Sequence, residues 1–253
     1  MGIERNGGIA FEGGGQGDAL LVLIHGLAAT ARVWSPMLEH APSRWPGRWI
    51  APDLRGHGAS ASRPSYRIKD YAADIACLVD RAGASAVTIL GHSLGGVIAL
   101  SLAGGDRIRP TRVFGLGIKV DWADDDLERL QQLSQRPPRL FENEEDALIQ
   151  HRRQCGLDCE LSSSLLERGV AQDGHRWRTA LDQAAFAVAR PTMEDLIAAS
   201  ACPFHLACGE HDAMVSIERL RGLDPGAARI AGAGHSAMVD DPGAVWDWMQ
   251  AAR

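Results

Sequence analysis

The sequence lacks a hydrophobic run long enough to cross a membrane. The longest aliphatic run near the N-terminus covers residues 20–24, far short of the roughly 20 apolar residues that a membrane-spanning helix requires. Residues 1–18 are rich in glycine and have neither the basic region nor the apolar stretch of a secretory signal peptide. These absences predict a cytoplasmic protein that does not use a membrane as its partner.

An excess of positive charge is also missing. The chain carries 26 Lys and Arg against 32 Asp and Glu, which gives a formal net charge of -6. Proteins that bind nucleic acid need a basic stripe to neutralise phosphates. The charge balance therefore argues against a nucleic-acid partner and favours a small-molecule substrate, while it leaves the oligomeric state open.

Cysteines are few and scattered. An odd number of thiols without regular spacing is typical of a reduced protein and not of a disulfide framework. Without a second pair of ligands they predict no metal site, and we expect no cofactor. The five positions are Cys77, Cys155, Cys159, Cys202 and Cys208.

A chain of 253 residues with 45% hydrophobic and 23% charged residues is typical of one globular body. Short apolar runs bounded by glycine or proline alternate with amphipathic stretches, which is the pattern of buried parallel strands covered by helices. We expect strands at residues 20–24, 49–51, 86–90, 113–118, 204–207 and 228–231, and helices at 70–81, 94–103 and 241–250. An α/β fold follows, in which helices flank a central, mostly parallel sheet.

One long region interrupts this alternation. Residues 119–200 contain no convincing strand run, but they contain several amphipathic stretches. We interpret them as a helical lid inserted after the sixth strand, between core segments 1–118 and 201–253. The expected helices of this insertion segment are residues 125–133, 144–153, 161–170 and 178–189.

The strongest chemical signal is Gly91-His-Ser-Leu-Gly-Gly96, directly after an apolar run and directly before a helical stretch. That is the required context of a G-x-S-x-G nucleophile elbow, in which the glycines permit a sharp strand-to-helix turn and expose the serine. The pattern alone is weak in a chain with 28 glycines. Its strand and helix, and the partners below, make Ser93 the candidate nucleophile.

A serine hydroxyl needs a base to take its proton and an acid to orient that base. His235 follows a strand in a glycine-rich loop before the last helix, and Asp212 directly follows another strand. Asp121 is the alternative acid, because it lies just beyond the strand that ends at residue 118. We prefer Asp212, whose loop is short and rich in turn signals.

Two main-chain N–H groups are expected to bind the oxyanion of a tetrahedral intermediate. One is that of Leu94, the residue after the nucleophile. The other is that of Leu27, in the sharp turn after the first long strand. His25 in the same turn is interpreted as structural.

These motifs occur in the order found in one large family, which the chain resembles from about residue 19 to its end, apart from the insertion segment. The resemblance is to the α/β-hydrolase superfamily, and it implies a lid over the active site and a bracing role for Arg55 and His57. It also implies reduced first strands, since few residues precede position 19. It does not extend to haloalkane dehalogenases or epoxide hydrolases, because the nucleophile position holds serine. The motifs are His25-Gly26, Asp53-Leu-Arg-Gly-His-Gly-Ala-Ser60, Gly91-His-Ser-Leu-Gly-Gly96, Gly209-Glu-His-Asp212 and Gly234-His235.

The expected activity is hydrolysis of a carboxylic ester of a small to medium organic substrate through an acyl-enzyme intermediate. Thioesters and certain carbon–carbon bonds are cleaved by the same machinery, so they stay alternatives. A ligand-binding receptor on the same fold is a more remote alternative. Arginines of the lid offer a binding site for a substrate carboxylate, although nearby acidic residues make surface pairing the simpler interpretation; they are Arg136, Arg139, Arg152 and Arg153.

Overall fold

Strand β3 (Ala19–Ile24) explains why this chain builds a sheet that is covered on both sides. Side chains alternate along a strand, so neighbouring residues face opposite sides of the sheet. Leu20, Val22 and Ile24 belong to one hydrophobic cluster, whereas Leu21 and Leu23 belong to another. A strand that is apolar on both sides therefore requires helices on both faces of the sheet.

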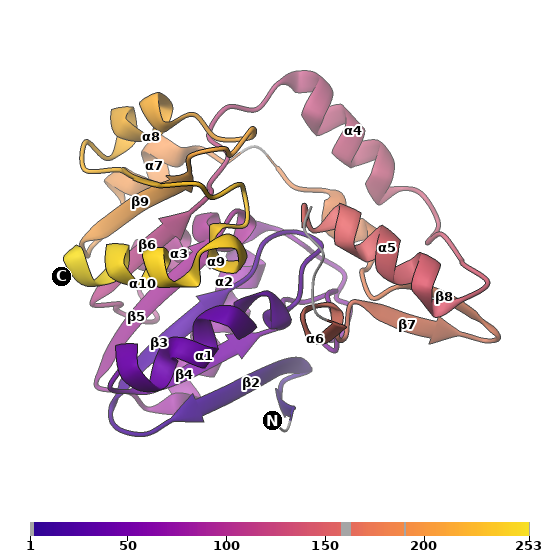
Figure 1. Ribbon diagram of the computed structural model, residues 1–253, viewed down its shortest axis with the longest axis horizontal. Coiled ribbons are helices and arrows are strands. Elements are labelled where there is room, and N and C mark those ends of the chain that lie inside the picture. Colours follow the sequence, from indigo (N-terminus) through magenta and orange to yellow (C-terminus); the bar gives the residue numbers. More distant parts are fainter. Residues whose placement is uncertain (1–2, 158–162, 190, 253) are drawn as a thin grey trace.

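The computed structural model describes residues 3–157, 163–189 and 191–252. Its main sheet has eight strands in the order β1-β2-β4-β3-β5-β6-β9-β10 (Figure 1). All neighbours from β4 to β10 are parallel, and β2 is antiparallel to both β1 and β4. The predicted mostly parallel sheet is thus confirmed. Its other strands are β1 (Glu4–Asn6), β2 (Ile9–Gly15), β4 (Arg48–Pro52), β5 (Ala86–His92), β6 (Arg112–Leu116), β9 (Phe204–Gly209) and β10 (Ala228–Ile230).

The N-terminal segment contributes more to the sheet than the sequence suggests. β2 is a full seven-residue strand, and only β1, with three residues, is short. The second half of β2 is a run of glycines, which favours a loop in isolation. A Cβ atom on Gly14 would lie 2.8 Å from the indole ring of Trp49 on the neighbouring strand, so that residue must lack a side chain.

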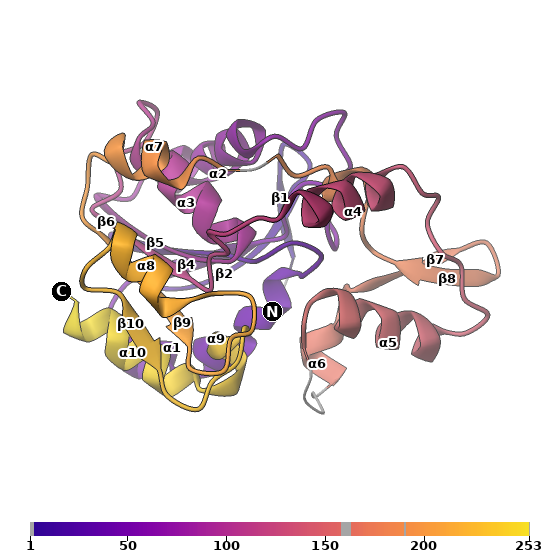
Figure 2. The ribbon, with the colours of Figure 1, turned by 90° about the horizontal axis from the view of Figure 1, so that it is seen from above.

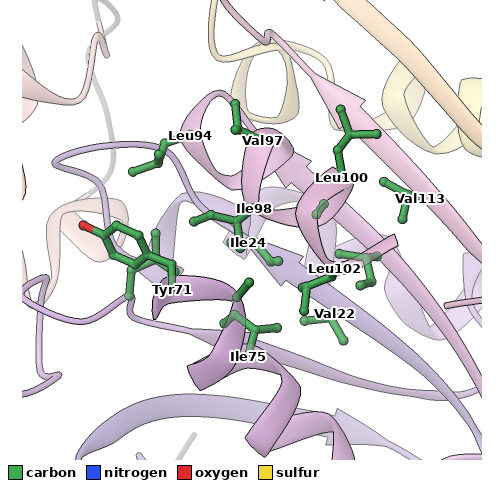
Figure 3. Close-up of a cluster of buried hydrophobic side chains, with 14 of the residues drawn as sticks. Val22, Ile24, Tyr71, Ile75, Leu94, Val97, Ile98, Leu100, Leu102 and Val113 are labelled. Carbon is green, nitrogen blue, oxygen red and sulfur yellow. The ribbon is translucent and has the colours of Figure 1, made fainter. Parts of the chain in front are cut away.

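Helices pack on both faces of the sheet, as Figure 2 shows. The side chains of α2, α3, α7 and α8 join the cluster that contains Leu20, and Figure 3 shows its centre between α2, α3 and β3. The side chains of α1, α9 and α10 join the opposite cluster. Their bounds are α1 (Ser35–Arg44), α2 (Ile68–Ala82), α3 (Leu94–Ala103), α7 (Met193–Ala198), α8 (Ile217–Leu223), α9 (Ala237–Asp240) and α10 (Pro242–Ala251), and the short 3-10 helix η1 spans Ala31–Trp34.

The insertion segment follows the sixth strand, and its part from α4 to a β-hairpin lies beside the sheet (Figures 1 and 2). Its last helix, α7, instead packs on a face of the sheet next to α3, so the expected boundary at residue 200 lies too far along the chain. Helices α4 (Asp124–Ser134) and α5 (Glu144–Gln154) confirm two of the expected helices. The expected helix at residues 178–189 is wrong, and so is the C-terminal part of the one at 161–170, whose first two residues lie outside the described ranges. The structure places α6 (Ser163–Leu166), β7 (Val170–Asp173), β8 (Arg176–Thr179) and the 3-10 helix η2 (Gln183–Phe186) there.

A β-hairpin, β7–β8, causes this difference. Asp173 pairs with Arg176, so the connecting loop has two residues. The first of them, Gly174, has φ +61°, the conformation that favours glycine at the first central position of a two-residue hairpin turn. Phe141 and Trp177 also exchange main-chain hydrogen bonds of 2.7 and 2.8 Å, which tie β8 to a distant segment.

Arg168 connects the insertion segment to the core. Its backbone adopts φ +65°, which is rare for a residue with a side chain. The guanidinium lies 3.1 Å from Glu12 Oε1 on β2 and 3.5 Å from Asp53 Oδ2 after β4. The three side chains are 12%, 5% and 0% exposed. Arg32 also pairs with Glu12, with 3.3 Å between Arg32 Nη1 and Glu12 Oε1, so two cations face the two buried carboxylates.

In the described ranges, no helix combines the length and the apolarity that a membrane span requires. Cys77, Cys155, Cys202 and Cys208 are free thiols. Cys159 lies outside the described residues.

Candidate active site

Ser93 occupies the turn between β5 and α3. Its backbone adopts φ 50° and ψ -117°, a strained conformation of the kind that a nucleophile elbow imposes. A Cβ atom on Gly91 would collide with the Gly95 carbonyl, and one on Gly95 would collide with the Ile24 carbonyl. Both glycines are therefore needed for strand, turn and helix to approach this closely.

The structure brings His235 and Asp212 together from two different loops at the carboxyl ends of β10 and β9. His235 Nδ1 lies 2.9 Å from Asp212 Oδ2, and the Asp212 side chain is fully buried. The other carboxylate oxygen, Oδ1, accepts the main-chain N–H of Met214 at 2.9 Å. Because a carboxylate only accepts hydrogen bonds, His235 carries its proton on Nδ1 and leaves Nε2 free to act as a base.

Asp121, the alternative acid, lies elsewhere. It forms an ion pair with Arg219, with 2.9 Å between Arg219 Nη2 and Asp121 Oδ1. Both side chains are more than half exposed. The carboxylate that His235 contacts is thus that of Asp212.

Ser93 and His235 line one cavity of about 580 Å³. That volume is in the range of small-molecule sites. Much of the lining is apolar and comes from both the core and the insertion segment; examples are Leu27, Val33, Leu94, Val97, Leu130, Leu133, Phe186 and Met238.

The two expected oxyanion donors also border this cavity. Leu94 is the first residue of α3, where main-chain N–H groups have no partner within the helix. Among the described residues, neither Leu94 N–H nor Leu27 N–H has a hydrogen-bond acceptor. Next to Leu27, Ala28 adopts φ 64°, which marks a second strained turn beside Ser93.

His92 is a residue of this site that the sequence analysis did not single out. Its Nε2–H donates to the main-chain oxygen of His235 at 2.9 Å, and the two rings lie 4.7 Å apart. Burial, with a smaller contribution from His235, holds the pKa of His92 well below its ordinary value of 6.5. His92 thereby links the nucleophile turn to the His235 loop as a neutral ring. Its position inside the elbow motif was the available signal.

The side chains of His25, Arg55 and His57 form hydrogen bonds within the protein core, as structural residues do. His25 Nε2 accepts the N–H of Leu54 at 2.9 Å, and its Nδ1–H donates to Gly26 O at 2.7 Å. Arg55 donates to Asp74 at 2.6 Å and to two main-chain carbonyls. Burial lowers the pKa of His25 to about 4 and that of His57 to about 3, so both rings are neutral at pH 7.

Charged side chains of the insertion segment enter the cavity lining. Lys119 and Asp126 form an ion pair of 2.5 Å, and Arg129 and Arg153 line the cavity beside them. Of the four arginines considered from sequence, Arg153 alone lines this cavity. In the ranges that the structure describes, no group of three or more metal-ligating side chains is present.

The sequence of the chain is similar to those of known proteins. The profile of the "Alpha/beta hydrolase family" matches residues 21–248. "Lipase LipV" of Mycobacterium tuberculosis is 35% identical over 103 residues, which cover 41% of this chain and 37% of the lipase. The "Magnesium-chelatase 30 kDa subunit" of Rhodobacter capsulatus is 36% identical over 104 residues, 40% of this chain and 35% of that protein. The aligned regions thus span little more than a third of these relatives.

Solved structures share the fold over nearly the whole chain. The "E-2-(Acetamidomethylene)succinate Hydrolase" superposes with a TM-score of 0.79 at 23% identity and covers 97% of this chain and 95% of its own. An esterase of Mycobacterium tuberculosis superposes with a TM-score of 0.78 at 19% identity and covers 99% and 90%. Together with the profile match over most of the sequence, these findings show that the chain belongs to the alpha/beta hydrolase family.

Proposed function

We propose that this protein is a serine hydrolase that cleaves a carboxylic ester through an acyl-enzyme intermediate. The observation that carries the proposal is the 2.9 Å hydrogen bond between His235 and the buried Asp212 carboxylate, beside a cavity that also exposes Ser93. A base that is oriented by an acid and shares a cavity with a strained serine is the arrangement that activates a hydroxyl.

In the proposed reaction Ser93 Oγ attacks the ester carbonyl while His235 Nε2 takes its proton. Asp212 stabilises the imidazolium that forms on His235, and the N–H groups of Leu27 and Leu94 bind the oxyanion. His235 then returns the proton to the leaving alcohol, which yields the acyl-enzyme. Water activated by the same histidine releases the acid.

The ester is preferred to the thioester or carbon–carbon alternatives because a lipase is among the proteins similar in sequence; among the similar folds an esterase and a thioesterase domain superpose equally well, so they do not decide between the two. The apolar part of the cavity lining is suited to an acyl chain or an apolar alcohol.

The test is hydrolysis of p-nitrophenyl esters from acetate to octanoate by the wild type and by Ser93→Ala. We expect turnover to peak at one acyl length and to fall at least about 10⁴-fold in Ser93→Ala. A fluorophosphonate probe should label the wild type at Ser93. Ser236→Ala is a matched control, since Ser236 also lines the cavity and its loss should leave labelling at Ser93 intact.

Two outcomes would contradict the proposal. A folded wild type that neither turns over esters nor reacts with fluorophosphonate would indicate a ligand-binding role. Labelling at Ser93 without ester turnover would direct the search to thioesters and carbon–carbon bonds.

A further inference from the structure

The cavity lining has an excess of positive charge in an acidic protein. Lys119, Arg129 and Arg153 contribute three cations, and Asp126 contributes the single carboxylate among the lining residues. The whole chain, in contrast, has a net charge of -6. Clustered charge of one sign around a concave site attracts ligands of the opposite sign.

Lys119 does not account for this excess, because the protein itself neutralises it. Its Nζ lies 2.5 Å from Asp126 Oδ2 and 5.1 Å from the centre of the Trp122 ring. The Lys119 side chain is 22% exposed. It is therefore held in place by protein partners and is not available as a primary anion ligand.

Arg129 and Arg153 remain available. Arg129 lies on α4 and Arg153 on α5, two helices beyond the same end of the sheet (Figure 2). In the part of the chain that the structure describes, neither guanidinium has a hydrogen bond or an ion pair within 4 Å. The pKa of Asp126 is lowered mainly by its hydrogen bond from Lys119, and the charge of Arg129 makes only a small contribution. Both residues are exposed as well as cavity-lining, which places them at the rim.

Gln154 gives a second sign of a missing ligand. It neighbours Arg153 on α5 and lines the same cavity. Its side-chain oxygen Oε1 is buried and has no hydrogen-bond donor among the described residues. A buried acceptor of this kind is normally satisfied by a hydrogen-bond donor, which an N–H or O–H group of a substrate would supply; a carboxylate only accepts, so the anionic end of a substrate would have to lie elsewhere.

We propose that the substrate carries a carboxylate at the end remote from the scissile bond, and that Arg129 and Arg153 bind this carboxylate. The inference rests on the proposed hydrolase function and specifies its substrate class as half-esters of dicarboxylic acids. Arginine suits the role because its planar guanidinium matches a carboxylate with two parallel hydrogen bonds. Two helices that each provide one arginine would hold the charged end at the rim while the ester reaches Ser93.

The experiment compares two esters of equal carbon count, p-nitrophenyl pentanoate and the mono-p-nitrophenyl ester of pentanedioic acid. We expect the wild type to favour the half-ester in kcat/KM. Arg129→Gln and Arg153→Gln should each reduce that preference roughly three- to tenfold, because rim charges are partly screened. Added salt should weaken the preference in the wild type and much less in the variants.

Arg152→Gln is the matched control. Arg152 adjoins Arg153 on α5 but does not line the cavity, so the same loss of charge there should leave the preference within about twofold. Equal use of both esters by the wild type would overturn the inference. An identical loss in Arg152→Gln and Arg153→Gln would also overturn it, since the effect would then be one of general charge.

Binding to Ser93→Ala separates the two proposals. Calorimetry on Ser93→Ala should show that pentanedioate, the dianion, binds more tightly than pentanoate. This difference in affinity should disappear when Arg153→Gln is added to Ser93→Ala. If the wild type hydrolyses neither ester but this binding pattern is found, the hydrolase proposal fails and the carboxylate site stands. If the neutral ester is hydrolysed and pentanedioate binds no better than pentanoate, the carboxylate site fails alone.

Discussion

Replacing Asp212 by asparagine tests the assignment of the acid, because the surroundings of this carboxylate fix how the new side chain must lie. Asp212 Oδ1 accepts the main-chain N–H of Met214 at 2.9 Å. An asparagine would keep its carbonyl oxygen there, since an amide NH₂ would oppose that N–H. Its NH₂ group would then face His235 Nδ1, which at present donates to Oδ2 at 2.9 Å.

An NH₂ group donates and does not accept, so Nδ1 would have to become the acceptor and the proton would move to Nε2. A histidine in that tautomer cannot take the serine proton. We expect kcat to fall about 10⁴-fold, as for the same tautomer change in another serine hydrolase, which corresponds to about 5.5 kcal/mol in the barrier. The assay is steady-state hydrolysis of the best p-nitrophenyl ester, with circular dichroism to confirm folding.

Asp121→Asn is the comparison, because Asp121 pairs with Arg219 in solvent and both side chains are more than half exposed. An exposed pair contributes about 0–1 kcal/mol to stability, and this one touches no group of the proposed reaction. We expect activity within about twofold of the wild type. A larger loss in Asp121→Asn than in Asp212→Asn would refute the assignment and the tautomer argument with it.

Three further changes test other parts of the structure. In Gly95→Ala the new Cβ atom would collide with a carbonyl of β3, so urea unfolding should show a fold that is less stable by about 4 kcal/mol or more. In the comparison variant Gly222→Ala the Cβ atom has open space on α8, and the same measurement should show a gain of about 0.5–1 kcal/mol. Arg168→Met removes the cation beside the buried Asp53 and leaves Arg32 beside Glu12, and it should reduce the free energy of unfolding by about 3 kcal/mol; no loss would show that the network is neutral overall. Since burial lowers the pKa of His25 to about 4 and of His57 to about 3, the unfolded chain binds more protons below about pH 6.5, and stability should fall as pH decreases from there toward 4. His57→Gln should reduce that slope by up to about 1.4 kcal/mol per pH unit; an unchanged slope would show that His57 stays unprotonated in the unfolded chain or is charged in the folded one.

The sheet could be predicted because its strands are apolar on both faces. Continuous apolar runs such as residues 20–24 have few alternatives to a buried strand, and glycine or proline marks their ends. The carboxyl ends of parallel strands meet at one edge of a sheet. For that reason, loops far apart in the sequence could be assigned to one site, and the structure indeed places Asp212 against His235.

The N-terminal strand and the β7–β8 hairpin could not be predicted in the same way. β2 ends in glycines that have low strand propensity, and neighbouring chain segments require them there: a Cβ atom on Gly14 would meet the indole ring of Trp49, and one on Gly15 would meet the Gly47 carbonyl. β8 is held by pairing with β7 and by the contact between Phe141 and Trp177. Both strands depend on distant partners, which override local propensity and are absent from a local pattern.

The residues that line the cavity could not be predicted from the sequence either. Amphipathic patterns located α4 and α5, but whether Arg152 or Arg153 faces the cavity depends on how each helix is docked. That docking depends on long-range contacts, such as those of α4 with η2 and of α5 with β8. A place for His92 in the site, in contrast, could have been predicted, because it is adjacent to Ser93. It was overlooked because the G-x-S-x-G pattern accepts any residue at that position.

Burial of His92 also explains how its ring can lie beside His235 without opposing the proton transfer proposed for His235. The rings of His92 and His235 lie 4.7 Å apart. Two positive charges at that separation would repel each other by about 3.5 kcal/mol at an effective dielectric constant of about 20, which would oppose formation of the His235 imidazolium. Because burial holds the pKa of His92 far below its ordinary value, its ring stays neutral at pH 7. It can then position His235 through a hydrogen bond without competing with it for the negative charge of Asp212.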